Sequence, residues 1–234
     1  MACASGRGLH ALRFLALLLV WACAGAHGAT LCDIGRRQSP IDIRPDAIKR
    51  QALPPLNFDY HGAPLKLADD GHTVRVRFGR GSELRIGKER YGLQQFHFHT
   101  PGGDRIAGEE FPMAAHLLHK SASGQLLAVV VLFRLGTENP LLASLLPLIP
   151  ARADGDHSPM GVTVDARSLL PSGRGYFRYP GSLTAPPCTE GVEWVVLKQP
   201  LELSPAQLAR YRQRFADNAR AVQPLHGRVV LESP

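Results

Sequence analysis

The fold is decided by the stretch Gln95-Phe96-His97-Phe98-His99, in which histidines alternate with phenylalanines. Side chains two residues apart on a β-strand point to the same face of the sheet. The two histidines therefore share one face of the predicted strand, and the two phenylalanines share the other. A strand that presents two imidazoles side by side is a candidate for holding a metal ion.

A third histidine follows on the next predicted strand. Residues 100–111 form an insert of hairpin length, and the strand after this insert carries His116. An antiparallel return places His116 beside His97 and His99. Three neutral imidazoles that leave one coordination position open are typical of a catalytic zinc site, whereas a structural site takes four protein ligands. Taken alone, an H-x-H pair is a weak signal, because surface histidine pairs are common.

From residue 56 onward the chain reads as short strands separated by turns. Residues 73–78 alternate apolar and polar side chains, which is the pattern of a half-buried strand. Residues 126–135 form a near-continuous apolar run, as expected of a central strand that is buried on both faces. Further strands are expected at 83–86, 93–100, 112–120 and 192–197.

Helix signals are few. The clearest is Ser204 followed by Pro205 and Gln207, which together form an N-cap, a first-turn proline and a capping box. A helix is therefore expected from this cap to about residue 216, with a shorter one at 140–148, and the Gly/Pro/Asp-rich residues 150–159 read as a loop. The sequence predicts one domain, mainly β (α+β), with a few short peripheral helices.

The first 26 residues have the composition of a secretory signal peptide. Arg7 and Arg13 precede an apolar run at 14–24, which ends in the small residues Ala24-Gly25-Ala26. We therefore expect a signal peptide at 1–26, a catalytic domain at 27–234, and a secreted or periplasmic protein. A buried N-terminal helix and lipid anchoring at Cys23 are the alternatives. No run in the chain approaches the roughly 18 apolar residues of a transmembrane helix, so no membrane span is expected.

The mature chain would keep two cysteines, Cys32 and Cys188. An even pair in an exported protein suggests one disulfide, and two separate buried thiols are the alternative. The net charge of +7 falls to +5 when Arg7 and Arg13 leave with the signal peptide. The remaining arginines are scattered rather than gathered in a stripe, so nucleic-acid binding is not expected.

Several further motifs occur in the order found in one enzyme family. They are Gln38-Ser39-Pro40-Ile41-Asp42-Ile43, Gly71-His72-Thr73-Val74, the segment 112–119, Tyr179-Pro180-Gly181-Ser182-Leu183-Thr184-Ala185-Pro186-Pro187-Cys188, Glu193-Trp194, Asn218, Arg220 and Gln223-Pro224-Leu225. With these motifs and the histidine strand, the chain resembles the alpha-class carbonic anhydrases over roughly residues 32–228. The two cysteines make it similar to the exported bacterial members.

The resemblance implies a twisted, mostly antiparallel sheet with Zn²⁺ at the bottom of a conical cavity, held by His97, His99 and His116. It implies reversible hydration of CO₂ to bicarbonate and a proton, with zinc-bound hydroxide as the nucleophile. The only partner it implies is this small-molecule substrate, and the chain is expected to be a monomer or a homodimer.

The resemblance also assigns individual roles. His72 is the expected proton shuttle, and Thr184 is the expected gatekeeper that orients the nucleophile. Gln95 and the backbone of Asn218 are the expected partners of His97 and His99. The residues expected to bind CO₂ are Leu118, Val129, Leu183, Thr184 and Trp194. On the sequence alone, His72 reads equally well as a solvated turn residue, Thr184 as a turn hydroxyl, and the apolar residues as core.

The remaining histidines are expected to lie outside the site. His119 is three positions beyond His116 and should face away from it, as a hydrogen-bonded core residue. His61, His157 and His226 are expected to be exposed.

Two positions depart from the family pattern. Ala114 stands where the family has a glutamate that accepts the N–H of the third ligand, and Gly103 stands where a second glutamate receives the gatekeeper hydroxyl. Asp104, beside Gly103, is a candidate substitute. Losing such supporting groups typically costs about 10–100-fold in metal affinity or activity. The sequence therefore predicts a functional but weakened carbonic anhydrase, with an inactive zinc-binding relative as the alternative.

A cupin-like iron oxygenase is a third interpretation of the H-x-H pair. Such sites carry a glutamate shortly after the paired histidines, and Gly102-Gly103-Asp104 supplies none. Three neutral imidazoles also favour zinc over the two-histidine, one-carboxylate iron site.

Overall fold

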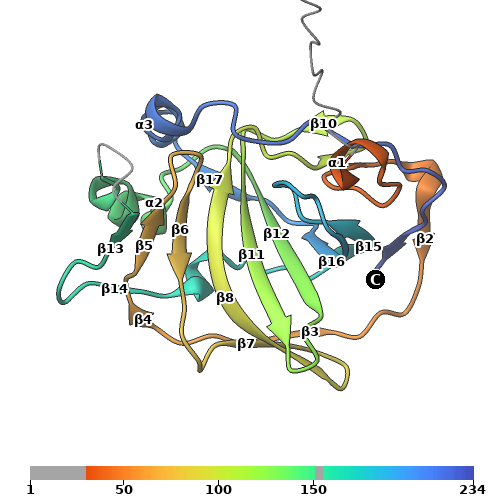
Figure 1. The fold of residues 1–234 in the computed structure, drawn as a ribbon, viewed down its shortest axis with the longest axis horizontal. Coiled ribbons are helices and arrows are strands. Elements are labelled where there is room, and N and C mark those ends of the chain that lie inside the picture. Colours follow the sequence, from red (N-terminus) through yellow and green to blue (C-terminus); the bar gives the residue numbers. More distant parts are fainter. Residues whose placement is uncertain (1–29, 151–154) are drawn as a thin grey trace, which may run out of the picture.

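A computed structural model describes residues 30–150 and 155–234, so the predicted signal peptide at 1–26 and Cys23 lie outside the described residues. One large sheet runs through the protein, with short helices at its margins (Figure 1). In spatial order its main strands are β13 (Gly155–His157), β5 (Leu67–Asp69), β6 (Val74–Arg77), β8 (Glu89–His99), β11 (Met113–Ser121), β12 (Leu126–Leu135), β16 (Glu190–Leu197), β15 (Tyr176–Ser182), β18 (Val230–Glu232) and β2 (Ile48–Arg50).

Shorter elements extend and surround this sheet. Beside the main path, β3 (Leu56–Asp59) pairs with β7 (Glu83–Ile86), which pairs with β8, and β17 (Leu201–Leu203) pairs with β12. The small sheets are formed by β1 (Asp42–Ile43), β9 (Arg105–Ile106) and β10 (Glu109–Glu110), and by β4 (Ala63–Pro64) and β14 (Thr163–Val164). The helices are α1 (Leu31–Ile34), α2 (Pro140–Leu145) and α3 (Pro205–Phe215), with 3₁₀ turns η1 (Pro45–Ala47), η2 (Leu146–Leu148) and η3 (Ala166–Leu169).

The strand pairing is mostly antiparallel. Strands β6, β8, β11 and β12 alternate in direction, whereas β16 runs parallel to β12 and β2 runs parallel to β18. The predicted mainly β domain with few short helices is therefore confirmed. The apolar run at 126–135 coincides with β12 from end to end.

The predicted helix after Ser204 is α3, and its cap forms as expected. The backbone N–H of Gln207 donates to the Ser204 hydroxyl over 3.2 Å, and the Ser204 N–H donates to Gln207 Oε1 over 3.1 Å. The loop prediction for 150–159 is wrong in part, because residues 155–157 form strand β13 on β5. All three residues of β13 are exposed, so this edge strand is held by backbone hydrogen bonds and carries no apolar alternation.

Two buried apolar clusters lie on opposite faces of the central strands. Alternate residues of β12 divide between them: Val129 and Val131 join the larger cluster, and Ala128 and Val130 join the smaller. The smaller cluster also contains Trp194 and lies on the face that holds the candidate site.

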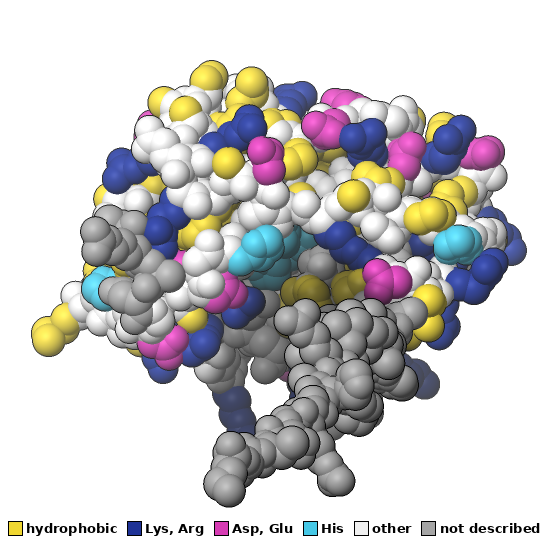
Figure 2. All heavy atoms as spheres, turned by 45° about the horizontal axis from the view of Figure 1, so that its top comes forward, with side chains coloured by type: hydrophobic (Ala, Val, Ile, Leu, Met, Phe, Trp, Pro, Cys, Tyr) yellow, Lys and Arg dark blue, Asp and Glu magenta, His cyan; other side chains and the backbone are white. Residues whose placement is uncertain are grey.

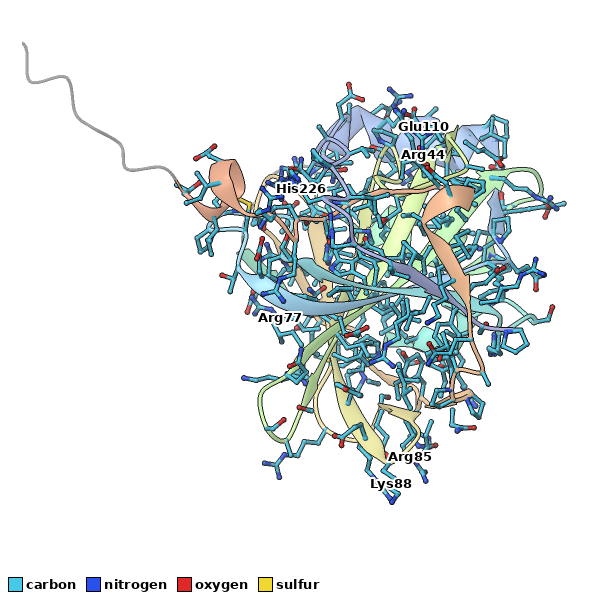
Figure 3. All side chains as sticks on the ribbon, turned by 90° about the vertical axis from the view of Figure 1, so that its right-hand side faces the viewer. Arg44, Arg77, Arg85, Lys88, Glu110 and His226 are labelled. Carbon is cyan, nitrogen blue, oxygen red and sulfur yellow. A yellow bond between two sulfur atoms is a disulfide. The ribbon has the colours of Figure 1, made fainter. Side chains whose placement is uncertain are left out.

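The helices of the described residues differ from what a membrane span requires. None of them is both long enough and apolar enough to cross a bilayer. Arg44 and Arg77 lie at different places on the molecule, whereas Arg85 and Lys88 lie together at its lower end (Figure 3).

Candidate active site

A bulge in β8 sets which face of the sheet His97 and His99 point to. Leu118 of β11 pairs with Gln95, but His119 pairs with Leu93, so Gln94 is an extra residue in β8. An inserted residue reverses the alternation of a strand. Leu93 and Phe96 consequently both point into the core, and Phe96 and Phe98 are fully buried there. The aromatic face anchors β8, and the imidazoles face the other way.

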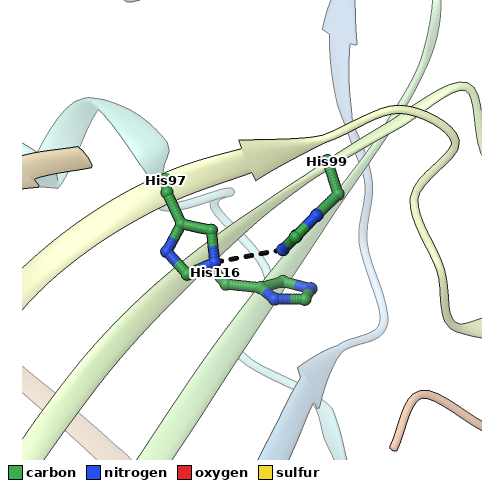
Figure 4. Close-up of side chains that lie close together, drawn as sticks. All are labelled: His97, His99 and His116. Atoms are coloured by element: carbon green, nitrogen blue, oxygen red, sulfur yellow. Dashed lines mark hydrogen bonds between the residues drawn. The ribbon is translucent and has the colours of Figure 1, made fainter. Parts of the chain in front are cut away.

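The three histidines meet at one point. His116 of β11 lies directly opposite His97 of β8, and one ring nitrogen of each histidine lies within 4.8 Å of the others. The Nε2 atoms of His97 and His99 are 3.0 Å apart (Figure 4). The register therefore brings together the three residues that the sequence singled out.

Burial keeps these imidazoles neutral. Desolvation lowers the pKa of His97 and of His116 well below the ordinary value, and neighbouring imidazoles lower both further. Desolvation also lowers the pKa of His99, to about 4, although the hydrogen bond that its ring donates to the Asn218 carbonyl opposes this shift. A neutral imidazole has a free lone pair for a metal, so the cluster is prepared for a cation.

Two of the imidazoles are oriented by hydrogen bonds. His97 Nδ1 lies 2.9 Å from Gln95 Oε1, and His99 Nδ1 lies 3.1 Å from the carbonyl oxygen of Asn218. These contacts leave both Nε2 atoms for a metal. The third differs: His116 Nε2 is buried without a hydrogen-bond partner among the described residues, and Ala114 lies two positions before it, also fully buried.

The histidines line a cavity of about 690 Å³. Figure 2 looks onto this face and shows histidine side chains in a hollow bordered by apolar and charged side chains. One part of the lining is apolar, with Leu118, Ala128, Leu183, Val192 and Trp194, and another is polar, with Asp70, His72, Arg75, Gln95 and Arg220. The cavity therefore has an apolar wall and a polar wall that meet near the imidazoles.

Most of the predicted site residues reach this cavity. His72 is exposed in the turn before β6, and Thr184 lies half-buried in the turn after β15. Leu118, Leu183 and Trp194 line the cavity as expected. His119 faces the opposite core, where its Nε2 is 2.6 Å from the Tyr60 hydroxyl, and His61, His157 and His226 are exposed.

The prediction for Val129 is wrong. Val129 packs in the larger cluster on the far face of β12, and Ala128 lines the cavity in its place. Leu118 pairs with Ala128 across the two strands, and paired residues share a face. A shift of one residue along a strand changes the face, and an uninterrupted apolar run gives no signal to set it.

Arg75 lines the cavity as well, although it was not among the predicted site residues. Arg75 pairs with His97 across β6 and β8, and its guanidinium forms an ion pair with Asp70 over 2.5 Å. The alternation of apolar and polar residues at 73–78 was the available signal, because it places Arg75 on the face opposite to Val74 and Val76. Both valines are fully buried on the core side.

Asp104 does not take the place of the missing glutamate. Its Oδ1 accepts hydrogen bonds from the backbone N–H of Ile41 over 3.1 Å and from the Tyr179 hydroxyl over 2.7 Å. Its Oδ2 is buried without a partner among the described residues. Burial raises the pKa of Asp104 to about 7, although the two hydrogen bonds and Arg228 oppose this shift. Gly103 has a φ of +83°, which strains any larger residue there.

The predicted disulfide forms between Cys32 and Cys188, which are 156 residues apart. Arg220 fastens the same region, donating from its guanidinium to the Cys32 carbonyl over 2.9 Å and to Gln38 Oε1 over 2.8 Å. Cys188 closes the turn that carries Thr184, so the bridge ties this wall of the cavity to the N-terminal segment.

The donor set fits a zinc ion. Three neutral imidazoles, with two Nε2 atoms already close together, supply nitrogen ligands and leave the cavity side free. A large β-sheet that carries three histidine ligands in a cavity is typical of a metalloenzyme whose metal ion takes part in catalysis.

Comparison with known proteins identifies the family. The model of the eukaryotic-type carbonic anhydrases matches residues 21–234. Carbonic anhydrases of Pectobacterium carotovorum and Klebsiella pneumoniae are 37% and 41% identical, each covering 86% of this chain and 82% of the relative. The alpha-carbonic anhydrase of Thermovibrio ammonificans, solved with sulfanilamide, superposes with a TM-score of 0.82 at 37% identity, over 86% of this chain and 89% of that one. The chain belongs to the alpha-type carbonic anhydrase family.

Proposed function

We infer that this protein is a carbonic anhydrase, a lyase that interconverts CO₂ and bicarbonate with Zn²⁺ as cofactor. The observation that carries this function is the cluster of His97, His99 and His116 at the base of a cavity with one apolar wall. When bound, Zn²⁺ acts as a Lewis acid that lowers the pKa of a coordinated water molecule to about 7. The side chains of the cavity bind CO₂, orient the nucleophile and carry the proton away.

The apolar wall receives the substrate. CO₂ is small and uncharged, and Leu118, Ala128, Leu183, Val192 and Trp194 offer it an apolar surface beside the imidazoles. Water gains little at such a surface, so the wall favours CO₂ over solvent at that place. Bicarbonate is charged, and it is expected to leave along the polar wall.

His72 exports the proton. It lies in the same cavity as the three histidines and is exposed, so its ring reaches both the interior and bulk water. An imidazole changes charge near neutral pH and can therefore pass a proton in either direction.

Thr184 orients the nucleophile but lacks the support expected in the family. Within the described chain no hydrogen bond of its hydroxyl is found, Gly103 offers no side chain, and Asp104 is engaged with Ile41 and Tyr179. We therefore propose an active enzyme that turns over more slowly than family members with both glutamates. The absence of each glutamate is expected to lower activity or metal affinity about 10–100-fold.

The experiment that tests the function combines zinc analysis with stopped-flow CO₂ hydration on the mature protein. We expect one zinc per chain and a hydration rate above that of buffer. Zinc binding without hydration would select the inactive zinc-binding relative, and absence of zinc would refute the assignment.

Replacing His72 by alanine is expected to slow hydration about tenfold or more in weak buffer, because a positioned proton carrier contributes roughly 10²–10⁴-fold. A high concentration of an imidazole-type buffer should restore part of the rate, because the buffer carries the proton instead. The same substitution at the exposed His61 is the matched control and should leave the rate unchanged. A buffer-independent loss would contradict the proton-carrier role.

We further propose that the protein is exported, either secreted or held in the periplasm, and acts as a monomer or homodimer. The disulfide between Cys32 and Cys188 supports export, because such bonds persist in oxidising compartments. Fractionation of cells and N-terminal sequencing of the mature chain test this localisation and the cleavage near residue 26.

A further inference from the structure

The third imidazole is held differently from the other two. Metal-binding histidines almost always donate their second N–H to a fixed acceptor, which sets the orientation of the ring. His97 has Gln95 and His99 has the Asn218 carbonyl in this role. His116 Nε2 is buried and has no partner in the described chain, and Ala114 offers only a methyl group.

An aromatic ring packs against the imidazole of His116. Trp194 of β16 meets the His116 ring at a centroid distance of 5.1 Å and an interplanar angle of 86°, an edge-to-face contact. The other ring contacts found for His116 in the described chain are those to His97 and His99. Among these rings, Trp194 is the one that does not belong to the histidine cluster, and its contact limits rotation of the His116 imidazole.

Trp194 is itself fixed on several sides. Its indole N–H donates to the Ser182 carbonyl over 3.0 Å. The absence of a side chain at Gly181 allows the indole to pass, since a Cβ there would lie 2.6 Å from Trp194 Cδ1. The Tyr179 ring also packs on it, stacked at a centroid distance of 5.7 Å and an angle of 22°.

The far end of this stack is anchored by a hydrogen bond. The Tyr179 hydroxyl donates to Asp104 Oδ1 over 2.7 Å, and the same oxygen accepts the Ile41 N–H. Tyr179 is fully buried, as is Asp104. A continuous series of contacts therefore runs from the Ile41 backbone through Asp104, Tyr179 and Trp194 to His116.

We propose that Trp194 and Tyr179 are positioning residues for His116, and that their ring stack orients the third metal ligand in place of a hydrogen-bond acceptor. This proposal rests on the proposed zinc-dependent function, because its effect is on how firmly His116 holds the metal. Edge-to-face and stacked aromatic pairs contribute a factor of about 2 to 13 to an equilibrium constant. A hydrogen-bonded acceptor contributes about 10–100-fold, so the stack is a partial replacement.

The test is the rate at which the zinc-loaded protein releases its metal to a chromophoric chelator. Tyr179→Phe keeps the ring and removes the hydroxyl anchor, and we expect it to speed release about threefold. Trp194→Leu removes the ring contact and should speed release about tenfold, with Trp194→Phe in between.

A matched control lies on the same strand. Tyr176 of β15 is also buried, and its hydroxyl donates to the Pro54 carbonyl over 2.8 Å, but it packs in the larger cluster on the other face. Tyr176→Phe removes a comparable hydrogen bond and should leave zinc release unchanged. Equal acceleration in the two phenylalanine variants would mean general loosening and would overturn the proposal, as would wild-type release in Trp194→Leu.

A second measurement asks whether the stack replaces the acceptor. Ala114→Glu places a carboxylate two residues before His116, and it should slow zinc release. In that background Tyr179→Phe should no longer accelerate release; an unchanged acceleration would overturn the idea of replacement. The comparison of Tyr179→Phe with Tyr176→Phe decides the positioning role even where Ala114→Glu does not fold.

The readout separates this proposal from the proposed function. A wild-type protein that takes up no zinc refutes the enzymatic assignment. A wild-type protein that binds zinc and hydrates CO₂, but whose release rate is the same in the Tyr179 and Trp194 variants, refutes the positioning role alone.

Discussion

Replacing His97 by alanine is expected to reduce CO₂ hydration by more than about 100-fold, to a rate near that of buffer, since losing a direct ligand should exceed the roughly 10–100-fold loss of a supporting group. His97 lies opposite His116 in the sheet, and its Nε2 is 3.0 Å from that of His99. Without it, two imidazoles remain and the set of three nitrogen ligands is incomplete. Zinc content by atomic spectroscopy and stopped-flow hydration should fall together.

His119→Ala is an informative comparison for this result. His119 is fully buried and lies on the same strand as His116, but it faces Tyr60 in the opposite core. We expect His119→Ala to lower stability while zinc content stays at one per chain. Hydration by His97→Ala at the wild-type rate would refute the site.

Replacing Asp104 by asparagine is expected to stabilise the protein increasingly as the pH rises. Burial raises the pKa of Asp104 from an ordinary 3.8 to about 7 in the folded state. Between these two values the folded chain holds a proton that the unfolded chain has released, so rising pH favours unfolding. Above pH 7 the raised pKa of Asp104 lowers the free energy of unfolding by about 4 kcal/mol. This figure follows from roughly 1.4 kcal/mol for each pH unit between the two pKa values.

Asparagine escapes this cost because it carries no charge. Its amide oxygen can still accept the hydrogen bonds from Ile41 and Tyr179. Urea unfolding of the wild type and of Asp104→Asn at several values between pH 5 and pH 8 measures the effect. The difference in unfolding free energy should grow with pH and level off above pH 7, whereas any fixed offset from the amide stays constant. A difference that is independent of pH would contradict a raised pKa for this carboxyl group.

The sequence predicted the strands of the site well because their patterns are local. The alternation of phenylalanine and histidine at 96–99 follows from the geometry of a single strand, and the apolar run at 126–135 is β12 from end to end. The capping box at Ser204 is likewise satisfied within four residues of chain. Such signals need no knowledge of what lies across the sheet.

Other features depend on pairing between strands and were not readable. Val129 and Ala128 are adjacent apolar residues in an uninterrupted run, and only the pairing of Leu118 with Ala128 shows which of them faces the cavity. The bulge at Gln94 is visible only in the register between β8 and β11. The strand at 155–157 lies at the edge of the sheet with all its side chains exposed, so its partner β5 defines it.

The sequence by itself determined the kind of chemistry: three imidazoles for a metal, a fold built mainly of strands, two cysteines for one bridge, and two missing carboxylates. Only the tertiary structure decided what surrounds these positions, with Asp104 bound to Tyr179 and Trp194 set against His116. The reason is physical. Residue types fix which atoms can bind a metal or a proton, but the orientation of a ring depends on contacts between segments far apart in the chain.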